Sequence, residues 1–236
     1  MAKKNKENMS LEMAELKKRY GNEIVRVVEG SVVKRVLKKT WTPANEAVFV
    51  VQQKNGGILT TPLISTLNLN MEDKLRYEAE LDPNWKQIVG YCVIRKGRNY
   101  FVTHRLNKTG EQRLIGAYSL GTGGHATTCE RVGDSIRREL EEEVGLTDNM
   151  IVGKQLAGYI LNEDTAVNAV HLGLVYEVVV NTDDVHCLET EKLAGEWMPV
   201  EDVRKLYEED KLESWSRYVV ENMIGVGANG EGKTKA

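Results

Sequence analysis

The chain has 236 residues, of which 41% are hydrophobic and 28% charged, and its formal net charge is −3. This composition is that of an ordinary soluble globular protein, and the slightly acidic balance argues against bulk nucleic-acid binding. No uncharged apolar run approaches the ~20 residues of a transmembrane helix, and the basic start lacks the apolar region of a signal peptide. Three cysteines without CxxC spacing predict neither a disulfide framework nor a zinc site, so we expect a protein of the reducing cytoplasm.

Residues 1–84 predict an N-terminal extension rich in β-structure, because β-branched stretches alternate there with turn signals. An Asn-Gly pair between two apolar stretches is typical of a hairpin. In chain order we expect a weak helix over 8–20, two strands within 23–41 that turn at Glu29-Gly30, two strands within 47–63 that turn at Asn55-Gly56, and a short helix over 71–81.

The pattern changes at Trp85, and residues 85–224 predict a mixed α/β domain with strands interleaved with helices. The final stretch, 225–236, is rich in glycine and polar residues and predicts a disordered tail. Within the domain we expect a strand pair over 87–106 that turns at Lys96-Gly97-Arg98, a strand over 114–120, a helix from 127 or 128 to 144, strands over 152–161 and 169–180, and one or two amphipathic helices over 197–224.

The strongest chemical signal lies in the predicted helix that ends at residue 144. Glu139, Glu142 and Glu143 are spaced by three and four residues, so they share one side of a helix. Like charges placed in this way repel each other unless a cation lies among them. Clusters of carboxylate oxygens suit hard divalent ions such as Mg2+ or Mn2+. The segment therefore predicts a metal site.

The ends and the buried face of this helix are also predicted from spacing. Thr127 and Glu130 stand as T-x-x-E, the spacing of a capping box, and Gly145 is the expected C-terminal stop. The preceding glycine-rich loop, 121–124, leaves backbone groups open to phosphate or metal. Apolar residues that recur at threes and fours predict the buried face: Cys129, Val132, Ile136, Leu140 and Val144.

The whole segment resembles the Nudix box, G-x5-E-x7-R-E-U-x-E-E-x-G-U. Every defining position is filled, by Gly124, Glu130, Arg138, Glu139, Leu140, Glu142, Glu143, Gly145 and Leu146. The predicted strand order from Trp85 to about Met223 resembles the rest of the Nudix fold, an α/β/α sandwich with a mixed sheet. The lead-in SLGTGGH is similar to that of a bacterial Nudix subgroup known as predicted phosphoesterases.

The resemblance implies a metal-dependent pyrophosphohydrolase. Its substrate would be a nucleoside diphosphate linked to another group, cleaved at the diphosphate bond by attack of water at phosphorus. Divalent ions, Mg2+ or Mn2+, would neutralise phosphate charge and orient the water. Glu130 and Arg138 would hold the ligand helix in shape. The implied metal ligands are Glu139, Glu142, Glu143 and the carbonyl of Gly123.

Several side chains are candidates for a supporting role in catalysis. The general base in the family varies, and it would be Glu142 within the box or an acid on a distant loop, where Glu163 and Asp164 are the candidates. His125 follows the glycine loop and would contact either phosphate or a backbone group. His171 alternates with apolar residues and would face either the core or the substrate.

Two other functions stay open from the sequence. An isopentenyl-diphosphate-isomerase-like enzyme would need a catalytic cysteine, but Cys92 and Cys129 are both expected to be buried. A nucleotide-binding sensor or regulatory module built on a Nudix core is the second alternative, although such a protein could lose its carboxylates without penalty. The extension over 1–84 would cover the substrate or mediate a homodimer. The residues of the box account only for binding of the diphosphate, so the sequence does not determine the groups attached to it.

Overall fold

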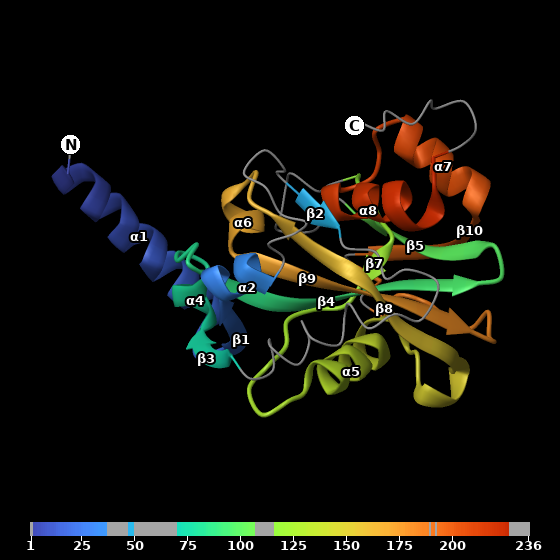
Figure 1. Ribbon diagram of the computed structural model, residues 1–236, viewed down its shortest axis with the longest axis horizontal. Helices are drawn as coiled ribbons and strands as arrows, with labels where there is room; N and C mark the ends of the chain where they lie inside the picture. Colours follow the sequence, from blue (N-terminus) through green and yellow to red (C-terminus); the bar gives the residue numbers. More distant parts are fainter. Residues whose placement is uncertain are drawn as a thin grey trace. The chain divides into compact units, whose positions relative to one another are not determined.

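The computed structural model describes residues 2–36, 47–49, 70–106, 116–188, 190–191 and 193–226. By compactness the chain divides into two units, which we call unit 1 and unit 2. Unit 1 comprises Met1–Val89, His125–Ser135 and Tyr159–Leu174, and unit 2 comprises Gly90–Gly124, Ile136–Gly158 and Val175–Ala236. Helices and strands both contribute, which confirms the predicted mixed α/β class (Figure 1). The predicted domain boundary between residues 84 and 85 stays a prediction.

Unit 1 is built around strand β1, which pairs antiparallel with β3 and with the start of β4. Val25 and Val27 of β1 form a fully buried cluster with Ala79, and Trp85 packs against it. Strand β2 pairs antiparallel with the end of β8. The elements are α1 (Ala2–Tyr20), β1 (Ile24–Glu29), α2 (Gly30–Val36), β2 (Ala47–Phe49), β3 (Met71–Leu75), α4 (Arg76–Ala79), α6 (Ala166–Ala169) and the unit 1 parts of β4 (Trp85–Lys96), β8 (Ile151–Asn162) and β9 (His171–Val180).

Two predictions for this region are wrong. The chain does not turn into a second strand at Glu29-Gly30 but continues directly into helix α2. Val32 and Val33 are buried there while Ser31 and Arg35 are exposed, which is the one-sided burial of a helix, so β-branched content misled the prediction. Residues 71–81 are only partly helical, because their first five residues form β3. The predicted helix over 8–20 is confirmed within α1.

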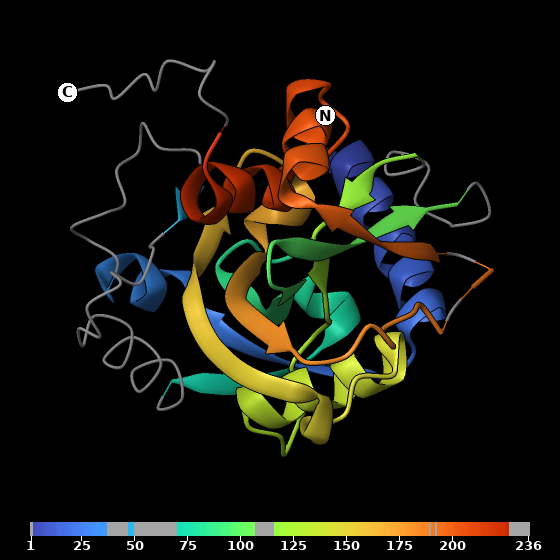
Figure 2. The same cartoon turned by 90° about the vertical axis from the view of Figure 1, so that its right-hand side faces the viewer.

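Unit 2 contains a sheet in the order β10-β5-β4-β9-β8, with β6 paired to β5 and β7 paired to β4. The predicted hairpin at Lys96-Gly97-Arg98 is confirmed, since Lys96 faces Asn99 in the β4–β5 register. Helix α7 contacts β10 and β5, as Figure 2 shows. The remaining elements are β5 (Asn99–Arg105), β6 (Tyr118–Ser119), β7 (Gly121–Thr122), α5 (Val132–Val144), η2 (Asp148–Met150), β10 (Leu193–Pro199), α7 (Val200–Glu208), α8 (Ser214–Val219) and η3 (Val220–Ile224).

Strand β10 differs from the prediction, which began the C-terminal helices at residue 197. Trp197 and Pro199 instead lie in β10, opposite Phe101 and Asn99 of β5. The two predicted strands over 152–161 and 169–180 are confirmed as β8 and β9. The predicted turn at 55–57, the start of the strand over 114–120 and the tail from residue 227 lie outside the described residues. In the described part of the chain, no helix is both long and apolar enough to cross a membrane.

Candidate metal centre

Helix α5 begins at Val132, later than the predicted start at Thr127. Cys129 lies just before it with φ at 65°, a left-handed conformation that an α-helix cannot contain. Thr127 therefore does not cap the helix, and its hydroxyl donates to the Glu130 carboxylate over 2.7 Å. The Ser135 hydroxyl donates to the same carboxylate oxygen over 2.6 Å. Glu130 thus ties the loop before α5 to the first turn of the helix.

The apolar face predicted for α5 is buried, with one correction. Cys129 is exposed because it lies in the loop before the helix. The helix ends as predicted: Gly145 has φ at +68°, and its N–H donates to the carbonyl of Glu141 over 3.1 Å. The acidic side chains therefore lie off the face that anchors the helix. The four anchoring residues are each 6% exposed or less: Val132, Ile136, Leu140 and Val144.

Arg138 holds two of the three carboxylates that the sequence singled out. Its Nη1 donates to Oε1 of Glu139 over 2.7 Å and to Oε2 of Glu142 over 3.0 Å. The side chain of Glu139 is 16% exposed, whereas that of Glu142 is 60% exposed. Glu139 is therefore the inner carboxylate and Glu142 the solvent-facing one, with a single guanidinium between them.

The glycine-rich loop lies directly against the other sides of these carboxylates. The N–H of Gly123 donates to Oε2 of Glu143 over 2.9 Å. Gly123 has φ at 139°, a region that favours glycine, and a Cβ there would lie 2.5 Å from the carbonyl oxygen of Gly90. A Cβ on Gly124 would lie 2.6 Å from Oε2 of Glu139. A glycine at 123 thus lets the loop approach β4 closely, and a glycine at 124 lets it approach the Glu139 carboxylate.

The donor set of this centre fits a hard divalent ion. Glu139, Glu142 and Glu143 offer carboxylate oxygens, and all three lie with Gly123 in unit 2. Oxygen-only ligands select Mg2+ or Mn2+ over softer metals. Glu139 and Glu142 share one guanidinium, that of Arg138, which holds these two like charges close together.

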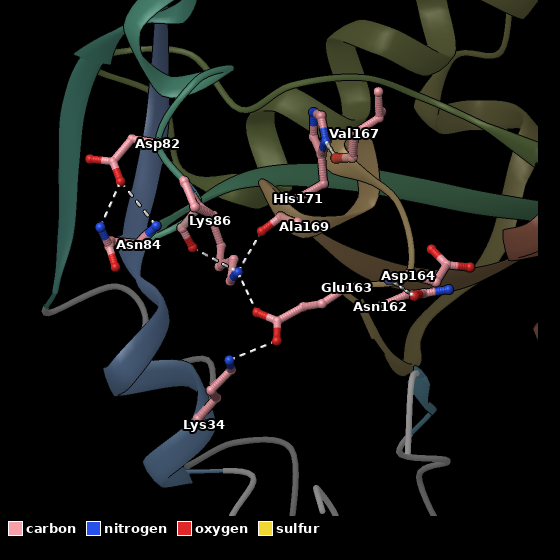
Figure 3. A network of polar contacts seen from close by, with 11 residues as sticks. Lys34, Asp82, Asn84, Lys86, Asn162, Glu163, Asp164, Val167, Ala169 and His171 are labelled. Atoms are coloured by element: carbon pink, nitrogen blue, oxygen red, sulfur yellow. Dashed lines mark hydrogen bonds and ion pairs between the residues drawn. The ribbon is translucent and has the colours of Figure 1, made fainter. Parts of the chain in front are cut away.

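Glu163, the predicted loop base, is held in unit 1 by two lysines (Figure 3). Lys34 and Lys86 each donate to a different oxygen of its carboxylate over 2.7 Å. Lys86 is 1% exposed and also donates to the carbonyls of Pro83 and Ala169. Burial acts to raise the pKa of Glu163, but the hydrogen bonds from the lysines outweigh it and lower the pKa below its usual value. The contacts are therefore those of a structural ion pair.

The other candidates outside the box are placed as follows. Asp164 accepts a hydrogen bond from Nδ2 of Asn168 over 2.7 Å and lies in the turn before α6. The ring Nε2 of His125 lies 3.1 Å from Nε2 of His171, and its predicted contact with phosphate or a backbone group stays a prediction. Burial, the charge of Arg76 and the second imidazole lower the pKa of His125 well below its usual value, so the ring is neutral near pH 7.

Burial excludes Cys92 as the catalytic cysteine of an isomerase. Cys92 is fully buried, and burial raises the pKa of its thiol to about 12, so it is protonated near neutral pH. Burial likewise raises the pKa of Cys187. Cys129 is exposed, in contrast to its predicted burial, and lies in the loop before α5. All three are free thiols.

The chain, including the segment that carries the acidic helix, is similar to known proteins. A family model described as NUDIX domain matches residues 86–223. Protein YmaB of Bacillus subtilis (strain 168) is 32% identical over 154 residues, which span 62% of this chain and 75% of that protein. The crystal structure of Tm1382, a protein assigned to the Nudix hydrolases, superposes with a TM-score of 0.64 at 23% identity, over 83% of this chain and 94% of that one.

Proposed function

This chain belongs to the Nudix hydrolase family, and from that premise we propose that it cleaves nucleoside diphosphates linked to another group with Mg2+ or Mn2+. Hydrolysis of a phosphoric anhydride bond is the activity of the family. The observation that carries the metal assignment is the bond from the Gly123 N–H to Glu143, beside a Glu139–Arg138–Glu142 bridge. Through these bonds the glycine-rich loop and Arg138 each hold carboxylates of one helix in place.

In this proposal each residue of the centre has a separate task. Glu139, Glu142 and Glu143 would hold the ion with the carbonyl of Gly123, and Arg138 sets the positions of the first two. When bound, a divalent ion neutralises phosphate charge and makes water more acidic. The water oxygen bonds to phosphorus, the bridging P–O bond breaks, and a carboxylate takes the proton of the water.

We assign the general base to Glu142 in preference to Glu163. Glu142 is the more exposed of the two acids that Arg138 bridges, so water reaches it readily. Glu163 is engaged by Lys34 and Lys86, and its lowered pKa makes it a weaker base. The choice rests on these contacts.

A phosphate-release assay over a library of nucleoside triphosphates, dinucleotides and nucleotide sugars tests the proposal, with and without Mn2+. We expect turnover of at least one compound only with the metal, and its loss in Glu143→Gln. Glu141→Gln is the matched control, because Glu141 is an exposed acid of the same helix outside the proposed ligand set. Wild-type-like turnover by Glu143→Gln would contradict the site. Tight binding of one compound with no turnover would instead indicate a nucleotide sensor.

The general base is tested with Glu142→Gln and Glu163→Gln, compared by kcat at saturating Mn2+. Loss of the base lowers kcat, typically by about 10²–10⁴-fold, and should do so in Glu142→Gln. Glu163→Gln should change the melting temperature more than kcat, because it removes the ion pair with buried Lys86. The reverse result, a normal kcat in Glu142→Gln and a collapsed kcat in a folded Glu163→Gln protein, would move the base to the loop.

The N-terminal extension and the cellular location belong to the same proposal. We infer that residues 1–84 cover the substrate or form a homodimer, as such extensions do in this family. A solution mass of the full chain and of a chain starting at Asp82 tests the dimer directly. The three free thiols agree with the reducing cytoplasm, where we place the enzyme.

A further inference from the structure

A second group of metal-ligating side chains lies in unit 1, whereas the three carboxylates of α5 belong to unit 2. It consists of Glu80 at the C-terminal cap of α4, His125 in the loop after β7, and His171 at the first position of β9. One ligand atom from each residue lies within 4.8 Å of the other two. Glu80 has a side chain that is 12% exposed, and His171 is 8% exposed. These are largely buried polar groups that the proposed hydrolysis does not use.

The two imidazoles meet in a geometry that suits a shared ligand. Their Nε2 atoms lie 3.1 Å apart, and the rings are inclined at 64° with centroids 5.2 Å apart. Two nitrogen ligands at about 2.1 Å from a tetrahedral ion are about 3.4 Å from each other. The observed separation therefore needs to change by only a few tenths of an ångström to accept an ion between the rings.

The protonation of His171 is set by its other nitrogen. Nδ1 lies 2.6 Å from the carbonyl oxygen of Val167, a contact drawn in Figure 3. A carbonyl only accepts, so Nδ1 carries the proton and Nε2 presents its lone pair toward His125. A hydrogen bond from the second nitrogen to a carbonyl is the arrangement that orients histidine ligands in metal sites.

The backbone and Arg76 fix the positions of two of the three ligands. His125 forms an antiparallel bridge with Val89, which fixes the segment that carries its ring. Arg76 donates to Oε1 of Glu80 over 3.3 Å and to Oε1 of Glu23 over 2.8 Å. Arg76 thus orients the carboxylate of Glu80.

We propose that Glu80, His125 and His171 form a zinc site, separate from the Mg2+ or Mn2+ centre on α5. Two imidazoles and one carboxylate are a ligand set that Zn2+ takes, with a fourth position for water, whereas Mg2+ prefers oxygen ligands alone. The ion would join three segments that are far apart in the sequence, so its binding stabilises the fold. At a hundredfold excess over Kd, the melting temperature should rise by about 5–10 °C.

Binding of Co2+ and Zn2+ to the untagged, chelator-stripped full chain tests this site. Excess Mg2+ is kept present so that the carboxylates of α5 are occupied. We expect one equivalent of Co2+ with the visible absorption of a nitrogen-ligated, four-coordinate ion, displaced by one equivalent of Zn2+ with a rise in melting temperature. His125→Asn and Glu80→Gln should each weaken Zn2+ binding at least tenfold. Two controls should bind as the wild type does: His186→Ala, whose side chain is 61% exposed, and Glu142→Gln on α5.

Three results would overturn the proposal. The first is a wild-type protein that binds no Co2+ and gains no thermal stability from Zn2+. The second is unchanged Zn2+ affinity in His125→Asn and Glu80→Gln. The third is loss of the Co2+ spectrum in Glu142→Gln with retention in His125→Asn, which would assign the ion to α5. His171→Ala is a confirming variant only, since its buried ring also contributes packing, and the two milder variants decide the question.

Discussion

Replacing Gly124 with alanine probes the metal centre through a single methyl group. The new Cβ would lie 2.6 Å from Oε2, 2.7 Å from Cδ and 2.9 Å from Oε1 of Glu139, whereas ordinary contacts of a Cβ are 3.4–4 Å. The carboxylate must therefore move by about 1 Å, which changes the geometry of its bond with Arg138. A misplacement of about 1 Å can cost ~10²-fold in rate, which corresponds to ~2.7 kcal/mol of transition-state stabilisation.

The fold should survive this change. Gly124 does not have a left-handed φ, so alanine is compatible with its backbone, and the atoms that the methyl group meets belong to a side chain. The matched control is Gly133→Ala in the first turn of α5, where a new Cβ meets nothing within 4 Å. That change should raise the free energy of unfolding by about 0.5–1 kcal/mol, because alanine favours the helix.

Three measurements on the two variants separate the site from the scaffold: Mn2+ affinity by electron paramagnetic resonance, kcat for whichever substrate the library identifies, and urea denaturation. We expect Gly124→Ala to lose Mn2+ affinity and roughly 10²-fold in kcat while its unfolding free energy stays within about 1 kcal/mol of the wild type. Gly133→Ala should keep the Mn2+ affinity and the kcat of the wild type. A Gly124→Ala protein with unchanged Mn2+ affinity and kcat would refute the reasoning, since Glu139 could then not be a ligand in this position.

Three further predictions concern the polar networks. Lys86→Met should lower the free energy of unfolding by roughly 2–3 kcal/mol in urea, because one oxygen of Glu163 and the carbonyls of Pro83 and Ala169 lose the ammonium group that donates to them. Lys34→Met, at a side chain 33% exposed, should cost less than ~1 kcal/mol, and equal losses would contradict the network. Folding lowers the pKa of Glu163 from 4.5, so the ionised carboxylate contributes stability above that pH, and this stability is lost as pH falls through the folded pKa. The loss of unfolding free energy in Lys86→Met should therefore become smaller between pH 7 and pH 3.5. A loss that is the same at both pH values would exclude this linkage. Tyr91→Phe removes a buried hydroxyl that donates to Glu213 over 2.5 Å. The free energy of unfolding should fall by about 1.5–3 kcal/mol in thermal or urea denaturation. An unchanged free energy of unfolding would show that this hydrogen bond is not retained in solution.

The parts of this protein that sequence predicts well are those set by neighbours in the chain. The spacing of Ile136, Leu140 and Val144 predicts the buried face of α5, because a helix repeats every 3.6 residues whatever surrounds it. Gly145 predicts its end, since few other residues adopt a left-handed φ without strain. The β4–β5 hairpin follows from its short turn in the same way.

Local pattern failed where two structures were compatible with the same residues. The β-branched stretch after Gly30 has the composition of a strand but the one-sided burial of helix α2. At Thr127 the capping-box spacing is present, yet Cys129 adopts a left-handed φ and delays the helix to Val132. Strand β10 became a strand because β5 offered it an edge, which no local window contains.

The sequence by itself determined the family and the three carboxylates of the box, because their spacing along one helix places them on one side. Only the tertiary structure showed that Lys34 and Lys86 hold Glu163. It alone brought Glu80, His125 and His171 together. Residues so far apart in the chain have no common period, and their proximity depends on how strands pair and loops close in three dimensions.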